Sequence, residues 1–279
     1  CIRDSTKAMA SGVRLNEVLD TQPSLTDEGS STQQEKAKAD RVAFEDVSFT
    51  YAGSKEPALS HISFTAKPGE TIGIIGGTGS AKTSLVNLIS RLYDVSSGSV
   101  KVGGKDVRSY DMEKLRDEVS VVLQKNVLFS GTILDNIAYG LEHVTEKEVM
   151  EVIKDVGLED MIEKLPDGIY TQLGEHGDKL SGGQRQRISI ARALIRKPKI
   201  IVFDEATSAL DSASEKKVQE ATSNMMKNCT TFLVAHRLST IRNADRIVAM
   251  RDGKIVEVGS YDELMEKKGY FYELKALQS

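Results

Sequence analysis

The stretch GGTGSAKTS at residues 76–84 follows the apolar run TIGII at 71–75 and precedes an apolar periodic segment that begins at Leu85. A glycine-rich turn between a strand and a helix is typical of a phosphate-binding loop, because its backbone N–H groups converge on an anion. In this pattern Lys82 is spaced to reach the β- and γ-phosphates of a nucleotide, and the Thr83 hydroxyl is spaced to hold Mg²⁺. The candidate nucleotide contacts are Gly76, Gly77, Thr78, Gly79, Ser80, Ala81, Lys82, Thr83 and Ser84.

One position departs from the usual G-x-x-x-x-G-K-[ST] pattern, because Ala81 stands where that pattern has glycine. If Ala81 needs a positive φ, alanine costs about 1–2 kcal/mol there. If it already has helical dihedrals, alanine is tolerated or favourable by up to about 1 kcal/mol. Because Ala81 directly precedes the helix that Lys82 opens, we expect helical dihedrals, and we expect weaker phosphate binding at most.

The composition is that of a chain that folds in water, with 279 residues of which 39% are hydrophobic and 28% are charged. A formal net charge of −4 gives no basic footprint, so nucleic-acid binding is not expected. Two distant cysteines, Cys1 and Cys229, indicate neither a disulfide framework nor a metal site. The chain has no apolar run of bilayer length, so no membrane span is expected. Its first residue is Cys1 and not methionine, and no signal-peptide pattern follows, so we expect a fragment of a longer protein.

The sequence divides into a leading segment and one folded domain. Residues 1–20 carry apolar positions at loosely helical spacing and precede Pro23, which predicts a connecting helix. Residues 24–40 are polar and aperiodic, which indicates a flexible linker. The domain is expected over residues 41–279.

The domain shows the pattern of an α/β fold. Alternating short segments between residues 42 and 66 predict an antiparallel β-subdomain at its start. Buried strands are predicted at 71–75, 119–123, 199–203 and 231–235, and helices between them favour a parallel sheet covered on both faces. An inserted helical subdomain is expected at about 125–196, and an Asp-Gly hairpin at 246–258.

Two adjacent carboxylates, Asp204 and Glu205, come directly after a buried strand. In a parallel sheet that position lies at the carboxyl edge, where ligands bind and where the phosphate loop also opens. Asp204 is then placed to hold Mg²⁺, and Glu205 to orient or deprotonate an attacking water. His236 follows the next strand and could hydrogen-bond the γ-phosphate.

The segment Leu180-Ser181-Gly182-Gly183-Gln184 lies between the phosphate loop and the Asp-Glu strand end. Together these motifs, in this order, resemble the nucleotide-binding domain of an ATP-binding cassette transporter. The resemblance covers about residues 41–279 and implies a P-loop NTPase core of the RecA-like kind. It also implies that ATP and Mg²⁺ bind and that ATP is hydrolysed.

The resemblance further implies a head-to-tail dimer of two such domains around two ATP molecules. Ser181, Gly182, Gly183 and Gln184 would meet the γ-phosphate held by the second domain. Tyr51 would stack on adenine, and Gln124 would reach the Mg²⁺ and the attacking water while facing a transmembrane partner. The segment SALD at 208–211 would pass signals between the two sites.

Two features favour an exporter that works at the cytoplasmic face of a membrane. The segment TQLGEHG at 171–177 is similar to the acidic loop with which exporters touch their coupling helices, and residues 1–40 resemble the extension of a last membrane helix. One alternative is a regulatory domain that binds nucleotide but barely hydrolyses it, which the departure at Ala81 motivates. Another is a soluble cassette protein of DNA maintenance or translation, but this chain contains neither a long coiled-coil insertion nor a second cassette.

Overall fold

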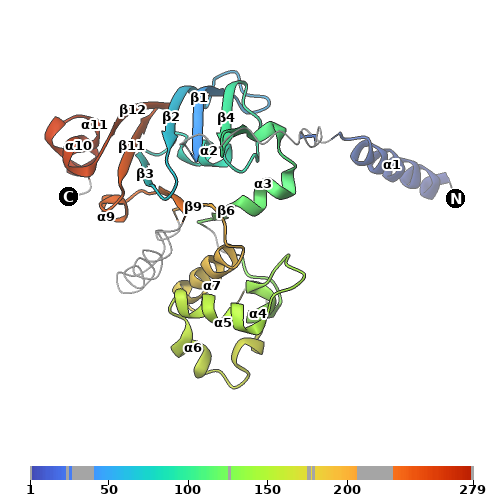
Figure 1. Cartoon of the computed structure of the whole chain (residues 1–279). Helices are drawn as coiled ribbons and strands as arrows, with labels where there is room; N and C mark the ends of the chain where they lie inside the picture. The colour runs from blue at the N-terminus through green and yellow to red at the C-terminus, as the bar shows by residue number, and fades with distance from the viewer. Residues whose placement is uncertain are drawn as a thin grey trace.

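A computed structural model of the chain describes residues 2–22, 25–26, 41–124, 127–174, 177, 180–205 and 229–277. The helix α1 (Ile2–Leu19) forms where the sequence predicts a helix over residues 1–20, and it extends away from the rest of the molecule (Figure 1). The expected linker lies mostly outside the described residues, and the segment at 208–211 lies wholly outside them. Within the described residues, no helix combines the length and apolarity needed to cross a bilayer.

The domain opens with the antiparallel β-subdomain that the alternating pattern predicts. Its sheet has the strand order β2-β1-β4-β5. The strands are β1 (Val42–Phe49), β2 (Leu59–Ala66), β4 (Ser97–Val102) and β5 (Lys105–Asp106). The register between β1 and both of its neighbours shifts near Asp46, whose φ is 47°. This irregularity explains why the apolar alternation of the sequence changes phase in the middle of β1.

The second sheet has six strands in the order β12-β11-β3-β10-β9-β6. They are β3 (Thr71–Gly76), β6 (Val119–Val122), β9 (Ile200–Asp204), β10 (Thr230–Val234), β11 (Arg246–Arg251) and β12 (Lys254–Gly259). All neighbouring pairs are parallel except β11 with β12, the predicted hairpin. Every residue of β9 is buried, as expected for a strand covered on both faces.

The register of the three central strands places the candidate residues at one edge. Val234 of β10 lies opposite Ile74 of β3 and Asp204 of β9. The loop after β3, the carboxylates that end β9 and the residues after β10 therefore leave the sheet side by side, at the carboxyl ends of the strands.

Helices cover this sheet. The short α2 (Lys82–Asn87) follows the glycine-rich loop and packs against β3, β9 and β10. The other covering helices are α3 (Met112–Glu118), α9 (Leu238–Ile241), α10 (Tyr261–Lys267) and α11 (Tyr270–Ala276), with a 3-10 turn η1 (Val107–Ser109) before α3. Figure 1 shows α10 and α11 beside β12, at the end of the sheet away from β6.

The helical subdomain forms a separate lobe below the sheets in Figure 1. It contains α4 (Ile133–Ile137), α5 (Glu146–Asp155), α6 (Glu159–Glu163), η2 (Gly168–Tyr170) and α7 (Gly182–Leu194). The side chains of Thr145 and Glu148 form a capping box at the start of α5. A two-stranded sheet of β7 (Gly131–Thr132) and β8 (Gln172–Leu173) was not expected; it joins the segment before α4 to the segment after η2.

Candidate nucleotide-binding site

The glycine-rich loop wraps around the ammonium group of Lys82. Lys82 Nζ donates to the carbonyl oxygens of Gly76 at 3.0 Å and Gly77 at 3.1 Å, and the residue is 5% exposed. A Cβ on Gly76 would lie 2.2 Å from the carbonyl oxygen of Met250, so only glycine fits the start of the loop. The side chain that the motif assigns to phosphate is thus held inside the loop by backbone carbonyls.

The expectation of helical dihedrals at Ala81 is wrong. Ala81 has φ 67° and ψ 27°, the left-handed conformation, and it occupies the N-cap position of α2 without a side-chain cap. The chain turns from the loop into the helix at this residue, so the residue before Lys82 lies outside the right-handed helix. The departure from glycine therefore carries the steric cost of a left-handed alanine.

We expect Ala81→Gly to raise the free energy of unfolding by about 0.5–1 kcal/mol. Relief of the left-handed strain contributes about 1–2 kcal/mol, and the greater freedom of glycine in the unfolded chain removes about 0.4–1 kcal/mol. Thermal unfolding without nucleotide measures the change. Ala138→Gly is the matched control, because Ala138 also borders a helix but has φ −80° and should lose stability on substitution. A loss of stability in both variants would contradict the strain at Ala81.

Asp204 and Thr83 form the oxygen-rich part of the site. The Thr83 hydroxyl donates to Asp204 Oδ1 at 3.2 Å, and Asp204 is 7% exposed. Burial raises the pKa of the Asp204 carboxyl, and the bond from Thr83 opposes this rise. A hydroxyl and a buried carboxylate are ligands that Mg²⁺ prefers, and a cation would favour the ionised carboxylate that burial disfavours. These two side chains therefore fit a magnesium ion.

Glu205 and His236 meet at the same edge of the sheet. Glu205 has φ 52°, and its N–H donates to the carbonyl of Val234 at 3.0 Å, which fixes the backbone after β9. Its carboxylate contacts Nε2 of His236, which lies two residues after the end of β10. The Glu205 side chain is 15% exposed and that of His236 is 41% exposed, so the carboxylate is mostly buried and the imidazole is partly open to solvent. This arrangement can hold and orient a proton acceptor beside the loop.

The charge balance of the site favours a phosphate that arrives with a divalent cation. Burial lowers the pKa of Lys82, and the negative charges of Glu205 and Asp204 oppose this shift. One buried ammonium group thus faces two carboxylates. A bare polyphosphate would be repelled by those carboxylates, whereas a cation between them and the phosphate removes the repulsion.

Tyr51 lies against the glycine-rich loop. Its hydroxyl is 2.7 Å from Ser84 Oγ, the last residue of the loop. Its ring packs edge-on against Phe49, with centroids 4.6 Å apart, and against Tyr93, with centroids 5.2 Å apart. Tyr51 is 37% exposed, so its ring is held in place while part of it remains open to solvent.

Gln124 leaves the same edge of the sheet from its outer strand. Val122, the last residue of β6, lies opposite Phe203 of β9. Gln124 comes two residues after Val122, just as Glu205 comes two residues after Phe203. Its side chain is exposed. The register therefore places Gln124 at the candidate site's edge.

The segment 180–184 is on the other lobe. Ser181 caps α7, with its side chain and that of Gln184 forming a capping box. α7 packs against α4, α5 and β6, whereas the loop's helix α2 packs against β3, β9 and β10. Among the described residues, no hydrogen bond joins this segment to loop 76–84. A Cβ on Gly182 would meet nothing within 4 Å, so the N-terminal end of α7 is open.

Two contacts to the site gave no signal in the sequence. The N–H of Gly77 donates to the hydroxyl of Tyr270 at 3.2 Å, although the two residues are 193 positions apart. Tyr93 supports Tyr51 from the segment after α2. A single tyrosine outside any motif does not indicate such a contact in the sequence, so these two contacts are seen only in the structure.

A cleft of about 1000 Å³ separates the two lobes beside β6. Its lining includes Glu113, Asp117, Val127, Phe129 and Arg192. Phe129 and Tyr139 stack with centroids 4.4 Å apart, and the guanidinium of Arg192 covers both rings. The cleft therefore combines an aromatic wall with charged groups of both signs.

Comparisons with known proteins match this geometry. The family model described as ABC transporter matches residues 59–208. The ATP-dependent lipid A-core flippase of Desulfotalea psychrophila (strain LSv54 / DSM 12343) is 46% identical, and the match covers 98% of this chain and 47% of the relative. The putative multidrug export ATP-binding/permease protein YgaD of Bacillus subtilis (strain 168) is 43% identical, with coverage of 98% and 47%.

A solved structure gives the same result in three dimensions. The structure of a bacterial Atm1-family ABC exporter with ATP bound matches with a TM-score of 0.87 and 35% identity, and the match covers 99% of this chain and 48% of that chain. The chain thus spans about half the length of the relatives it matches.

Proposed function

The chain belongs to the ABC transporter family, and on that premise we propose that it is the domain that binds and hydrolyses ATP to drive export across a membrane. The observation that carries the proposal is the convergence of four groups at one sheet edge. The loop with Lys82, the Thr83–Asp204 pair, Glu205 and His236 leave three adjacent strands there. This set contains a phosphate cradle, a cation site and a proton acceptor.

The loop residues 76–84 would bind the phosphates of ATP, and Tyr51 would stack on its adenine ring. Lys82 would exchange its bonds with Gly76 and Gly77 for charge-assisted bonds to phosphate oxygens. Thr83 and Asp204 would hold Mg²⁺, with Gln124 at the same edge; bound Mg²⁺ neutralises charge on the phosphate oxygens.

Glu205 would act as the general base of hydrolysis. Its carboxylate would accept a proton from the attacking water, and His236 would keep that carboxylate oriented through the contact at Nε2. His236 is the more exposed of the two, so its imidazole is also placed to donate to a γ-phosphate oxygen. Mutual orientation of base and partner is the usual requirement for an activated nucleophile.

A second nucleotide-binding domain would complete each site. Ser181, Gly182, Gly183 and Gln184 surround the open N-terminal end of α7, where unpaired backbone N–H groups and the helix dipole favour an anion. We infer that these residues bind the γ-phosphate held by the loop of a partner domain. The position of the segment on a different lobe from its own loop supports a shared site of this kind.

The other partner would be a transmembrane domain of the same transporter. The cleft between the lobes, with its aromatic wall and mixed charges, offers a docking surface close to Gln124. The segment 171–177, part of which the structure describes, would contribute to the same contact. α1 and residues 20–40 would connect this domain to a membrane helix, which places the domain at the cytoplasmic face of the membrane.

Steady-state phosphate release tests the proposal and separates its alternatives. We expect the purified chain to hydrolyse ATP with Mg²⁺ and to stop when EDTA removes the cation. A regulatory domain would bind a fluorescent ATP analogue without comparable turnover, and Ala81→Gly would then restore hydrolysis. A chain that neither binds nor hydrolyses ATP at any protein concentration would contradict the proposed function.

A further inference from the structure

A buried arginine lies at the far end of the phosphate-loop helix. Arg91 follows α2 by four residues, has φ 50°, and its side chain is 4% exposed. Backbone hydrogen bonds continue past α2 to this point, from Arg91 N–H to Leu88 at 3.2 Å and from Leu92 N–H to Asn87 at 3.0 Å. A continuous bonded segment therefore joins Lys82, which opens the helix, to Arg91.

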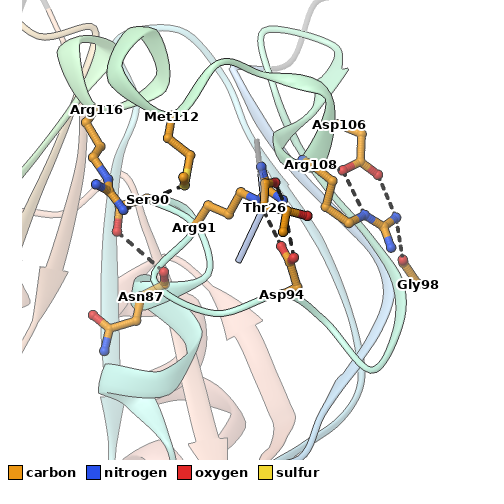
Figure 2. A network of polar contacts seen from close by, with 10 residues as sticks. All are labelled: Thr26, Asn87, Ser90, Arg91, Asp94, Gly98, Asp106, Arg108, Met112 and Arg116. Carbon is orange, nitrogen blue, oxygen red and sulfur yellow. Dashed lines mark hydrogen bonds and ion pairs between the residues drawn. The ribbon is translucent and has the colours of Figure 1, made fainter. Parts of the chain in front are cut away.

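The guanidinium of Arg91 binds two parts of the chain that are far apart in the sequence (Figure 2). Its Nε donates to Asp94 Oδ1 at 2.9 Å, and one terminal nitrogen donates to Asp94 Oδ2 at 3.3 Å. The same nitrogen donates to the carbonyl oxygen of Thr26 at 3.2 Å, across 65 positions. Thr26 belongs to the segment that follows α1, and its neighbour Leu25 is partly buried. The leading segment thus touches the domain at Arg91.

We propose that Arg91 is an anchor that ties the leading segment to the phosphate-loop helix, so that nucleotide binding and the position of that segment are coupled. The proposal rests on the function given above, because it uses α2 as the carrier of the phosphate-binding groups. Because Arg91 restrains the far end of α2, less conformational entropy is lost when the loop binds phosphate, and this raises the affinity for nucleotide. By reciprocity, bound nucleotide strengthens the contact at Thr26.

Arg108 provides a matched control in the same region of the molecule (Figure 2). Its Nε donates to Asp106 Oδ1 at 3.1 Å, and one terminal nitrogen donates both to Asp106 Oδ2 at 2.7 Å and to the carbonyl of Gly98 at 3.2 Å. Arg108 therefore forms the same fork on an aspartate and a carbonyl as Arg91 does. Arg108 differs in that its carbonyl partner belongs to the β-subdomain and not to the leading segment, and in that its side chain is 42% exposed, against 4% for Arg91.

The experiment follows a spin label on the leading segment and the affinity for ATP in the same protein. The label is placed on Gln22→Cys in a Cys1→Ser background, where Cys229 is 7% exposed and shielded from reaction. Arg91→Lys keeps the charge but loses the fork. We expect it to increase the mobility of the label without nucleotide and to weaken ATP binding about threefold, as the loss of one hydrogen bond would. Arg108→Lys should leave both quantities at the wild-type value.

A second variant tests whether Arg91 acts through the leading segment or only stabilises the residues around it. Leu25→Asp should release the segment without touching Arg91 or Asp94, and it should reproduce both effects of Arg91→Lys. In the double variant the loss of affinity should be no larger than in either single variant, because both act on one contact. Additive losses, or unchanged label mobility in Arg91→Lys, would overturn the proposal. Failure of the wild-type chain to bind ATP would instead overturn the proposed function, and label mobility without nucleotide would still decide whether Arg91 anchors the segment.

Discussion

Glu205→Gln is expected to lower ATP turnover about 10²–10⁴-fold, the usual contribution of a general base. The amide has nearly the same shape as the carboxylate but cannot accept the proton of the attacking water. It also keeps a contact partner for His236 beside β10. Nucleotide binding should persist because the loop and the Thr83–Asp204 pair are unchanged. ATP-dependent dimers, measured by size-exclusion chromatography with light scattering, should accumulate because the closed state no longer turns over.

Glu70→Gln is a suitable control for this variant. The Glu70 side chain is 14% exposed, close to the 15% of Glu205, and it pairs with Arg246 instead of a group at the site. It precedes β3, so it lies at the opposite edge of the sheet from the phosphate loop. Turnover per folded molecule should be retained in this control. Full turnover in Glu205→Gln would show that the base is another group.

Lys82→Met is expected to change affinity and stability in opposite directions. Loss of the charged bonds to phosphate should weaken ATP binding by about 30- to 1000-fold, corresponding to about 2–4 kcal/mol. Without nucleotide, however, burial disfavours the charged form of Lys82, as its lowered pKa indicates, and an apolar side chain of similar size removes that penalty, so the free energy of unfolding should rise. Isothermal titration and thermal unfolding measure the two effects. Lys254→Met, at an exposed position, should change neither.

The stability gain of Lys82→Met should depend on pH. Burial lowers the pKa of Lys82 in the folded chain below its ordinary value of 10.5. Between these two values the unfolded chain binds more protons than the folded one, so the stability of the wild-type protein rises with pH in that window. The advantage of Lys82→Met should therefore shrink as pH increases towards 10.5. A constant advantage across alkaline pH would mean that Lys82 titrates alike in both states.

Much of the fold was predictable because its strands and turns are specified locally. The buried strands β9 and β10 read as short apolar runs, and the hairpin of β11 and β12 followed from Asp252-Gly253, both of which have positive φ. From these elements the carboxyl edge that carries Asp204 and Glu205 could be inferred before any coordinates.

The remaining features depend on contacts between distant segments. The bond between Tyr51 and Ser84 and the support from Tyr270 require the two sheets to be placed first. The position of Ala81 next to a helix does not indicate its left-handed dihedrals, because the chain changes direction at this residue. The sheet of β7 and β8 has only two residues in each strand, too few for a periodic signal.

The open end of α7 has a consequence for how the enzyme should respond to its own concentration. Gly182 faces free space on one lobe while the phosphate loop lies on the other, so under the proposed function two chains would have to meet before one site is complete. Turnover per chain should then obey mass action: it rises with protein concentration in dilute solution and reaches a plateau when pairing is complete. Attachment of two such domains to one membrane assembly would replace that bimolecular encounter by a high effective concentration. The membrane partner would then control the turnover rate without contributing a catalytic group to the site.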